Sequence, residues 1–542
     1  MKDVASSGIT GWLAQAAEIG DQQLVSRSQQ AGHEARYAEF PSELHPIVAQ
    51  ALPSAGIEQL YDHQVHAFNA AMHGNTIVTT ATASGKSLCF NLPVLHTLAC
   101  DLSARALYIY PTKALAQDQA RAMAQLAREM KRGAKPLLRH AIYDGDTPRT
   151  ERKAVRENAN VVLTNPDMLH QGILPNHERW AEFFANLAWI VVDEAHVYRG
   201  VFGSHVANVL RRLQRVAAVY GTAPHIVMTS ATIANPTELA TQLTGREFEL
   251  IAEDGGPQPG REIVMWNTPL IDEATGRRGS ALAEAASLLA DLVRRDVRTI
   301  CFMKSRRGVE LIHRFATDLL SDKPELADAV MPYRAGYTAA QRRDIEGRLS
   351  SGELKAVVAT NALELGIDIG HLDAAICTTF PGTVASLRQM WGRAGRDHEG
   401  LAIYIAGDDA LDQFFCRHPD EFLDRPVEAA ILDPHNEQIH MSHLYVAAHE
   451  LPLGPEDAEF FGPDTMKVAA QLEAKGLLQR RTTHYRTRGA EFPAGAISLR
   501  SASADSFAIV NSVSGELIGT IEAERAFTNV HPGAAYLHLG QA

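Results

Sequence analysis

Residues 76–87 read TIVTTATASGKS and decide the fold of the first half of the chain. The β-branched start predicts a strand, and the end carries a glycine, a lysine and a hydroxyl in the order of a phosphate-binding loop that opens a helix. The first glycine that is usual in such loops is absent. We expect Lys86 to reach the β- and γ-phosphates of ATP and Ser87 to bind Mg²⁺. The predicted ATP contacts of this loop are Thr82, Ala83, Ser84, Gly85, Lys86 and Ser87.

A second segment, residues 191–196, reads VVDEAH and ends an apolar run. Ligands bind at the carboxyl ends of the strands in open α/β sheets, so we expect Asp193 at that edge. We predict that Asp193 holds Mg²⁺ through water and that Glu194 orients and polarises the attacking water. His196 is predicted to couple this site to the neighbouring domain. Lys86 and the two acids together indicate ATP hydrolysis.

Length and composition indicate several globular domains. The 542 residues exceed one ordinary domain, and 46% hydrophobic with 21% charged residues is typical of buried cores. No apolar run has membrane-spanning length and the start lacks a signal-peptide pattern, so we expect a cytoplasmic protein without membrane contact. The five cysteines are scattered without a CxxC pair, which argues against a zinc site.

Charge gives a weaker indication. A net charge of −13 argues against a basic coat for nucleic acid, although the local field decides binding. We interpret the basic pairs, each taken alone, as solvated faces; they are Arg211-Arg212, Arg306-Arg307, Arg342-Arg343 and Arg480-Arg481.

Apolar, β-branched runs alternate with amphipathic helical patterns in two stretches. Such runs suit strands that are buried on both faces, hence parallel sheets covered by helices. We therefore expect two tandem doubly wound α/β domains, joined at the Gly/Pro-rich residues 254–260. The predicted strands are residues 76–80, 106–110, 161–164, 189–192, 225–229, 299–302, 356–359 and 374–377, and the predicted helices are 113–132, 204–220, 307–320 and 338–349.

The sequence pattern changes after residue 400. Helical patterns from 412 to 475 and a short basic hairpin at 477–489 suggest a winged-helix unit. Residues 497–501, 506–510 and 535–539 are predicted strands of a small β domain that is cut short. The predicted domains are an N-terminal segment at 1–55, the two α/β domains at 56–260 and 261–410, the winged helix at 411–490 and the β domain at 491–542.

Two further patterns can each be explained in more than one way. His435, His440, His443 and His449 could bind a metal, but polar positions on helices explain them better. The basic residues around Tyr485 fit a nucleic-acid-contacting wing or a solvated hairpin equally well. Both interpretations of the hairpin stay open.

The ordered motifs resemble those of superfamily 2 helicases, and within them the MrfA/YprA group, which is related to the Lhr group. They lie at residues 61–64, 80–87, 111–116, 164–169, 193–196, 229–232, 301–305, 359–368 and 389–396. The resemblance implies two RecA-like domains, a winged helix and a β domain. Relatives of the group carry a C-terminal four-cysteine cluster, and this chain ends before one, so we expect a shortened member.

The same resemblance implies further nucleotide contacts. Gln64 would read the adenine and Gln389 would contact the γ-phosphate. Arg393 and Arg396 would be arginine fingers that stabilise charge on the transferred phosphoryl group. Asp368 would tie the motif at 359–368 to the nucleotide.

The resemblance also implies coupling and strand contacts. Ser230 and Thr232 would link hydrolysis to motion. Without the motif series, N-capping or strand packing would explain the threonines. The implied contacts with the nucleic-acid backbone are Thr112, Lys113, Thr164, Ser305, Arg306 and Thr360.

The sequence therefore predicts an ATP- and Mg²⁺-dependent helicase or translocase acting on single-stranded or partly duplex DNA, with RNA not excluded. Movement from 3′ to 5′ and a role in DNA repair follow from the resemblance alone. The alternatives are an RNA helicase and an ATP-gated remodeller or scaffold that binds without unwinding. The sequence names no DNA lesion, protein partner, oligomeric state or strand-separating element.

Overall fold

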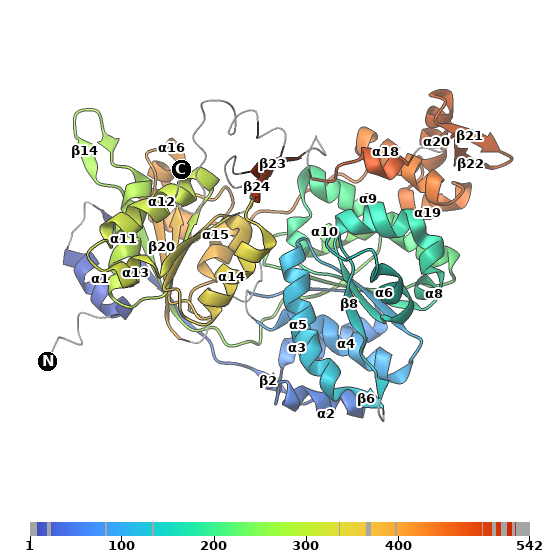
Figure 1. Ribbon diagram of the computed structural model, residues 1–542, viewed down its shortest axis with the longest axis horizontal. Helices are drawn as coiled ribbons and strands as arrows, with labels where there is room; N and C mark the ends of the chain where they lie inside the picture. The colour runs from blue at the N-terminus through green and yellow to red at the C-terminus, as the bar shows by residue number, and fades with distance from the viewer. Residues whose placement is uncertain are drawn as a thin grey trace. The chain divides into compact units, whose positions relative to one another are not determined.

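The chain forms two units, each assembled from separate parts of the sequence (Figure 1). Unit 1 takes Met1–Ala35, Pro257–Glu428 and Ser503–Ala542, and unit 2 takes Arg36–Gly256 and Ala429–Ala502. The computed structural model describes residues 8–18, 23–81, 84–132, 135–334, 336–364, 370–395, 398–489, 492–500, 506–510, 517–522 and 526.

Unit 2 is built on a seven-stranded sheet of order β12-β4-β11-β10-β5-β9-β8, in which every neighbouring pair is parallel. The predicted doubly wound parallel sheet is therefore confirmed. The strands are Glu249–Ile251 (β12), Thr76–Thr79 (β4), His225–Ser230 (β11), Leu187–Val192 (β10), Arg105–Ile109 (β5), Val161–Thr164 (β9) and His140–Ile142 (β8).

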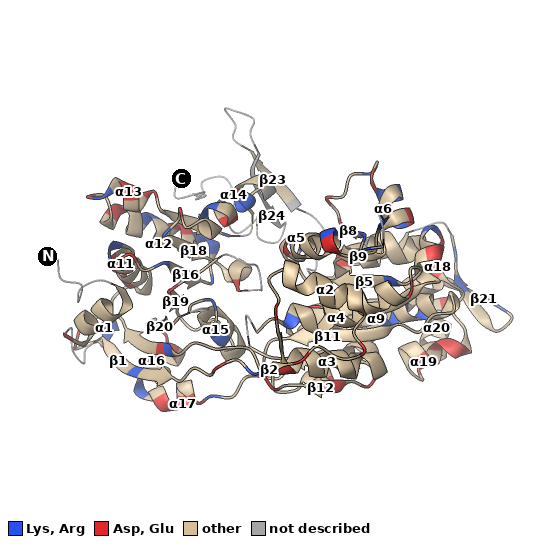
Figure 2. Ribbon diagram, turned by 90° about the horizontal axis from the view of Figure 1, so that it is seen from below, with Lys and Arg blue, Asp and Glu red and all other residues tan. Residues whose placement is uncertain are grey.

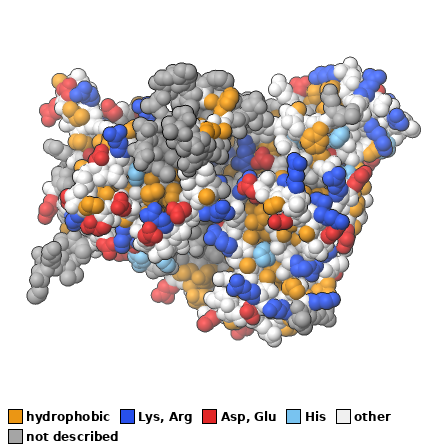
Figure 3. All heavy atoms as spheres, viewed as in Figure 1, with side chains coloured by type: hydrophobic (Ala, Val, Ile, Leu, Met, Phe, Trp, Pro, Cys, Tyr) orange, Lys and Arg blue, Asp and Glu red, His pale blue; other side chains and the backbone are white. Residues whose placement is uncertain are grey.

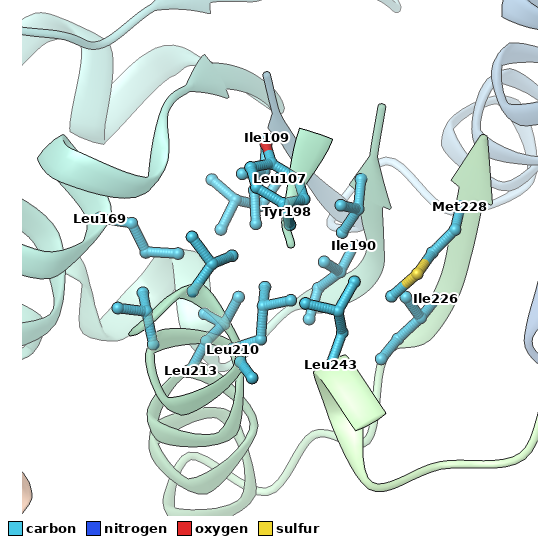
Figure 4. Close-up of a cluster of buried hydrophobic side chains, with 14 of the residues drawn as sticks. Leu107, Ile109, Leu169, Ile190, Tyr198, Leu210, Leu213, Ile226, Met228 and Leu243 are labelled. Atoms are coloured by element: carbon cyan, nitrogen blue, oxygen red, sulfur yellow. The ribbon is translucent and has the colours of Figure 1, made fainter. Parts of the chain in front are cut away.

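Helices cover both faces of this sheet because its central strands are apolar on both sides; every residue of β4, β5 and β9 is buried. In Figure 4 the side chains of β5, β10 and β11 meet those of α9 and α10 in one core. The main helices are Pro46–Ser54 (α2), Asp62–His73 (α3), Lys86–Cys100 (α4), Lys113–Glu129 (α5), Arg152–Asn158 (α6), Gly200–Val219 (α9) and Pro236–Thr244 (α10).

The C-terminal part of unit 2 packs on α9. It has its own small apolar core, and α18 contacts α9 directly. Arg215 of α9 reaches across to Asp457 at 2.5 Å and also donates to three backbone carbonyls of this part. Its elements are Glu437–Glu450 (α18), Ala458–Phe461 (α19), Thr465–Ala474 (α20), Leu478–Arg481 (β21) and His484–Thr487 (β22).

Unit 1 carries the second sheet, of order β1-β13-β20-β19-β16-β18-β17. All pairs are parallel except β1 with β13. The strands are Leu24–Gln30 (β1), Arg261–Asn267 (β13), Gly400–Ala406 (β20), Ala374–Thr378 (β19), Thr299–Met303 (β16), Ala356–Ala359 (β18) and Val330–Tyr333 (β17). The helices include Ala281–Arg294 (α11), Arg306–Leu319 (α12), Ala339–Ser350 (α14), Val384–Trp391 (α15), Ala410–Arg417 (α16) and Pro419–Leu423 (α17).

The start of the chain contributes to the second sheet. Helix α1 (Gly8–Glu18) buries Trp12, whose ring lies 6.0 Å from that of Trp266 on β13, and β1 pairs along the same strand. Residues 36–54, in contrast, lie in unit 2. The structure thus divides the predicted 1–55 segment between the two units.

Three sequence predictions need correction. Residues 497–500 form no strand, because Leu499 is buried in the core of unit 2 and the segment pairs with no other strand in the described part of the chain. Helix α5 ends at Glu129 rather than at 132. The pair Arg211-Arg212 is buried, not solvated, because both side chains face the C-terminal part of unit 2.

The remaining predictions concern charge, metals and the chain end. Lys and Arg are interspersed with Asp and Glu over the ribbon (Figure 2), although Lys and Arg gather on the face of unit 2 turned to the viewer in Figure 3. Among the described residues there is no group of acidic, histidine and cysteine side chains that could hold a metal, and no helix long and apolar enough to cross a membrane. Strands β23 (Ser506–Val510) and β24 (Leu517–Glu522) pair, whereas the predicted strand at 535–539 lies outside the described residues.

Candidate nucleotide and strand-binding sites

The strand order of unit 2 brings the nucleotide motifs together. Strands β4, β11 and β10 are neighbours and parallel, so their carboxyl ends lie along one edge of the sheet. Residues 80–87 follow β4, Ser230 ends β11 and Asp193 follows β10. The sheet therefore places the phosphate loop, the motif at 229–232 and the acidic pair side by side.

Gly85 is required by the shape of the phosphate loop. It caps α4 with a φ of 78°, in the left-handed region, and a Cβ there would lie 2.6 Å from Nε2 of Gln64. Gln64 is buried; its amide donates to the Gly85 carbonyl at 3.0 Å and accepts from the Tyr61 N–H at 3.0 Å. Gln64 therefore links the start of α3 to the phosphate loop and holds the loop in place.

The ammonium of Lys86 is held by the backbone of the phosphate loop. It donates to the carbonyls of Thr80 at 2.8 Å and Ala81 at 2.7 Å, while the hydroxyls of Thr80 and Ser84 are 2.6 Å apart. The Ala81 N–H donates to Asp254 at 3.1 Å. These contacts hold the lysine and the loop as one cluster. The predicted contacts Thr82 and Ala83 lie outside the described residues.

Ser87 lies in the first turn of α4, where its hydroxyl accepts a hydrogen bond from Nε2 of Gln119 at 3.1 Å. Gln119 lies on α5, so the bond ties α4 to the helix that follows β5. A hydroxyl held in this way, together with the carboxylate of Asp193, supplies oxygen ligands of the kind that Mg²⁺ prefers. The residues present fit the predicted ion.

Asp193 is a buried carboxylate. It accepts hydrogen bonds from the Glu194 N–H at 2.9 Å and from the Thr229 hydroxyl. Burial and the adjacent Glu194 carboxylate raise the pKa of Asp193 to about 7. Glu194 has a φ of 52°, a conformation that costs a non-glycine residue about 1–3 kcal/mol.

His196 connects the acidic pair to the motif at 229–232. Its Nδ1 accepts a hydrogen bond from the Ala231 N–H at 3.1 Å and lies 3.6 Å from a carboxylate oxygen of Glu194. Burial lowers the pKa of His196 despite the opposing effect of Glu194. The Ser230 hydroxyl is buried and donates to the Ala231 carbonyl at 2.7 Å, whereas Thr232 is exposed. Ala231 and His196 thus form a short path between the two motifs.

Three of the residues predicted to contact the nucleic-acid backbone are helix N-caps. Thr112 caps α5, Ser305 caps α12 and Thr360 caps the short 3₁₀ turn Asn361–Leu363. N-capping, the plain explanation for such residues, therefore describes their contacts here. Thr164 is fully buried, and its hydroxyl donates to the Tyr143 carbonyl at 2.7 Å.

The two basic residues predicted to contact nucleic acid lie beside these caps. Lys113 forms an ion pair with Asp146 at 2.7 Å, and both side chains are more than a third exposed. Arg306 begins α12 and is half-buried. Both residues lie in the first turn of a helix whose preceding residue is a hydroxyl cap.

The residues predicted from the second α/β domain lie in unit 1. Gln389 is buried on α15. Arg393 is 1% exposed, and its Nη2 donates to the Glu364 carbonyl at 2.7 Å. Arg396 and Asp368 lie outside the described residues.

Sequence reasoning missed several residues that shape these sites. Gln119 and Asp254 each bond to a residue of the phosphate loop, yet a single polar residue on a helix or in a linker carries no signal of that role. Thr229 belongs to the predicted motif at 229–232, but its bond to Asp193 was not predicted. It also missed a pocket of about 640 Å³ beside Thr112, to which Arg500 contributes. The ion pair Arg212–Glu450 was missed because its partners are far apart in the sequence.

Comparison with known proteins places these motifs in a family. The DEAD/DEAH box helicase model matches residues 61–239, the helicase conserved C-terminal domain 283–398, and the winged-helix domain of ATP-dependent helicase HRQ1 432–502. The predicted winged helix is thereby confirmed.

Relatives match over most of the chain. The ATP-dependent helicase YprA of Bacillus subtilis is 42% identical over 96% of this chain and 69% of its own. The ATP-dependent helicase hrq1 of Schizosaccharomyces pombe is 39% identical over 94% of this chain, which spans 48% of that protein. A crystal structure of the DUF1998 helicase MrfA bound to DNA is 40% identical, with a TM-score of 0.91 over 98% of this chain and 75% of that one. The chain belongs to the superfamily 2 helicases of the MrfA/YprA group and is an ATP-hydrolysing, ATP-dependent helicase.

Proposed function

We propose that the chain uses ATP hydrolysis to move along single-stranded DNA, from 3′ to 5′, and that it serves DNA repair. The observation that carries the choice of DNA is the likeness to MrfA, whose crystal structure has DNA bound and matches 98% of this chain. Direction and repair rest on the likeness to the MrfA/YprA group.

In unit 2 the phosphate end of ATP is held by the loop before α4. Lys86 exchanges its two carbonyl partners for phosphate oxygens, and the helix N-terminus favours the same negative charge. Ser87 and Asp193 would hold Mg²⁺, which would partly neutralise the charge of the phosphates. Burial and the neighbouring Glu194 carboxylate raise the pKa of Asp193, and a bound cation would offset both effects. Glu194 orients the attacking water.

In unit 1 we propose that Gln389, Arg393 and Arg396 supply the remaining contacts to the γ-phosphate, and that Asp368 joins them. Their arginines would stabilise charge that develops on the transferred phosphoryl group. Gln64 would read the adenine; to do so its amide gives up one of the two bonds with which it braces the loop.

The path from hydrolysis to movement runs through His196. A change at Glu194 reaches the imidazole at 3.6 Å, and from there the Ala231 N–H and the neighbouring Ser230 and Thr232. We propose that this path adjusts the grip on the strand. The grip itself uses Thr112, Lys113, Ser305, Arg306 and Thr360, as helix N-termini that position a phosphate without reading sequence. Thr164 acts indirectly, because its hydroxyl is buried.

The test is the steady-state ATPase rate of the full chain, measured without nucleic acid and with single-stranded DNA, duplex DNA or single-stranded RNA. Glu194→Gln serves as the matched control, because it keeps the size of the side chain and removes the charge. We expect strong stimulation by single-stranded DNA that the variant abolishes. Equal stimulation by RNA would refute the choice of DNA, and no stimulation would favour a scaffold.

Direction and biological role need separate tests. Duplexes with a single 3′ or 5′ tail should be unwound only when the tail is 3′. A role in repair predicts that a strain without the gene is hypersensitive to DNA-damaging agents and is rescued by the wild-type chain but not by Glu194→Gln. Unwinding from the 5′ tail alone would overturn the proposed polarity.

A further inference from the structure

A pocket of about 640 Å³ opens at the carboxyl edge of the unit 2 sheet. It lies where residues follow three neighbouring strands, β5, β9 and β8. Its lining includes Thr112 and Lys113 after β5, Asn165 and Asp167 after β9, and Gly145 after β8. The pocket therefore collects the family's strand-binding motifs of this domain in one place.

One lining residue comes from a distant part of the chain. Arg500 lies near the end of the matched winged-helix domain, yet its Nε lies 2.9 Å from a carboxylate oxygen of Asp167 and its Nη2 donates to the Pro111 carbonyl at 2.6 Å. Its guanidinium also stacks over the ring of Phe202, 4.6 Å from the centroid. Three different contacts thus fix this guanidinium at the wall of the pocket.

The segment that delivers Arg500 is itself anchored. Leu499 is 2% exposed in the core of unit 2, and Ile497 packs against the same core. The alternation of these apolar residues predicted a strand, but here the segment bends at Leu499 and Arg500 and buries its apolar side chains against the domain. The next residue, Arg500, is directed to the pocket as a consequence.

The charge of the pocket suits an anionic strand. Three cations line it, namely Lys113, Arg152 and Arg500, against one acid, Asp167. Helix α5 begins at Lys113 and adds the positive end of its dipole. The Arg500–Asp167 pair is nearly half exposed on both sides, so it is weak and can exchange partners with a phosphate.

We propose that Arg500 is a phosphate ligand for single-stranded DNA, contributed to the pocket by the last residues of the winged-helix domain. When the strand enters, the guanidinium leaves Asp167 and binds a phosphodiester oxygen, while Phe202 keeps it in place. The inference rests on the proposed function and adds a strand contact outside the helicase motifs.

The position also gives the strand a route to the ATP site. Phe202 lies on α9, which begins at Gly200 just after the acidic motif, and its ring is 5.6 Å from that of the buried Tyr198. A shift of Arg500 on strand binding acts on this pair of rings. We therefore expect Arg500 to affect DNA-stimulated hydrolysis as well as affinity.

The experiment compares Arg500→Ala with Arg246→Ala in the full chain. Arg246 is a matched control because it is also a partly exposed arginine that pairs across to the winged helix, with Glu459 at 3.8 Å, but does not line the pocket. Binding of a fluorescent single-stranded DNA is measured over a range of salt. We expect Arg500→Ala to weaken binding about tenfold, as for a lost charged hydrogen bond, and to lower the slope of log affinity against log salt by about 0.7.

Asp167→Asn separates a phosphate ligand from a structural staple. If Arg500 binds phosphate, removing its competing acid should leave DNA binding equal or tighter, and Arg500→Lys should recover most of the salt slope. If the ion pair only holds the segment in place, Asp167→Asn should weaken binding as Arg500→Ala does and lower the melting temperature equally. That second result would overturn the inference.

Failure of this inference can be told from failure of the proposed function. If the wild-type chain binds single-stranded DNA and Arg500→Ala behaves like Arg246→Ala, only the role of Arg500 is wrong. If the wild-type chain binds no single-stranded DNA, the proposed function fails and the role of Arg500 fails with it.

Discussion

Removing Glu450 should loosen the attachment of the winged helix to the first RecA-like domain. The Glu450 carboxylate forms a bidentate ion pair with Arg212 of α9, and both side chains are 0% exposed. Arg212 also donates to Nδ1 of His170 at 2.7 Å and of His443 at 3.3 Å. Glu450→Ala therefore leaves the buried guanidinium of Arg212 in contact with two neutral imidazoles and without the carboxylate of Glu450.

The expected cost follows from this burial. Breaking a buried ion pair by deleting one partner costs about 3–5 kcal/mol, because the remaining charge stays desolvated. The exposed pair Arg246–Glu459 also joins the winged helix to the first domain, but such a pair contributes only about 0–1 kcal/mol. Glu459→Ala is therefore the matched control.

Amide hydrogen exchange of α18 is the appropriate measurement, because it reports local opening in a chain of several domains where a single unfolding transition is not expected. Glu450→Ala should reduce the protection of α18 by about two to four orders of magnitude. Glu459→Ala should change it by less than about tenfold.

A double substitution tests the physical reason. Arg212→Met with Glu450→Leu replaces the pair by apolar groups, so no charge is left unpaired, and most of the protection should return. Equal effects of Glu450→Ala and Glu459→Ala would refute the reasoning. So would a double variant that is no better protected than Glu450→Ala.

Three further predictions follow from buried groups. Burial lowers the pKa of His170 to about 3 and that of His443 well below its usual value; the unfolded chain therefore takes up protons below about pH 6.5 that the folded chain refuses, and stability should fall as pH drops, by about 1.4 kcal/mol per pH unit for each histidine, measured by urea unfolding between pH 7 and 5. The pKa of Asp193 is raised from 3.8 to about 7, so the stability of the metal-free fold should fall as pH rises between these two values and stay at the lower level above pH 7. Asp193→Asn should abolish ATPase activity yet raise the melting temperature in EDTA at pH 8, and do so less at pH 5.5. Trp12→Ala should destabilise unit 1 by about 3–5 kcal/mol, because the ring is 2% exposed against Trp266; thermal unfolding followed by tryptophan fluorescence would show no change if the N-terminal helix were a loose appendage.

The nucleotide site could be predicted from the sequence because its determinants are local. Residues 76–87 hold a strand, a turn and a helix start in one stretch, and an acidic pair directly follows an apolar strand at Asp193. Parallel strands then bring both stretches to one edge without any further information. The order of the strands decides which motifs become neighbours, and topology rules favour that order.

The N-terminal contribution to unit 1 could not be predicted in this way. Strand β1 has the sequence LVSRSQQ, which is apolar only at its start and leaves the strand half-buried at the sheet edge. Its partner β13 lies far along the chain; the pair Arg27–Glu262 alone spans 235 positions. Nothing in a polar heptapeptide specifies so distant a partner.

Arg212 shows why charge is a poor guide to exposure. In the sequence it belongs to a basic pair on an amphipathic helix, where a solvated face is the usual outcome. In the structure it is buried, since Glu450 and two histidines arrive from other elements to satisfy it. A buried cation is explained by its partners, and these are invisible until the fold is known.

Helix α9 connects the acidic motif, Arg500 and the winged helix. It begins shortly after the acidic motif, its Phe202 contacts the guanidinium of Arg500, and its Arg212 and Arg215 hold the winged helix. Because both arginine pairs are buried, the winged helix is fixed to the domain that holds Lys86 and Glu194 and must move with it. We therefore expect any nucleic-acid contact that the winged-helix domain makes to move together with the first RecA-like domain.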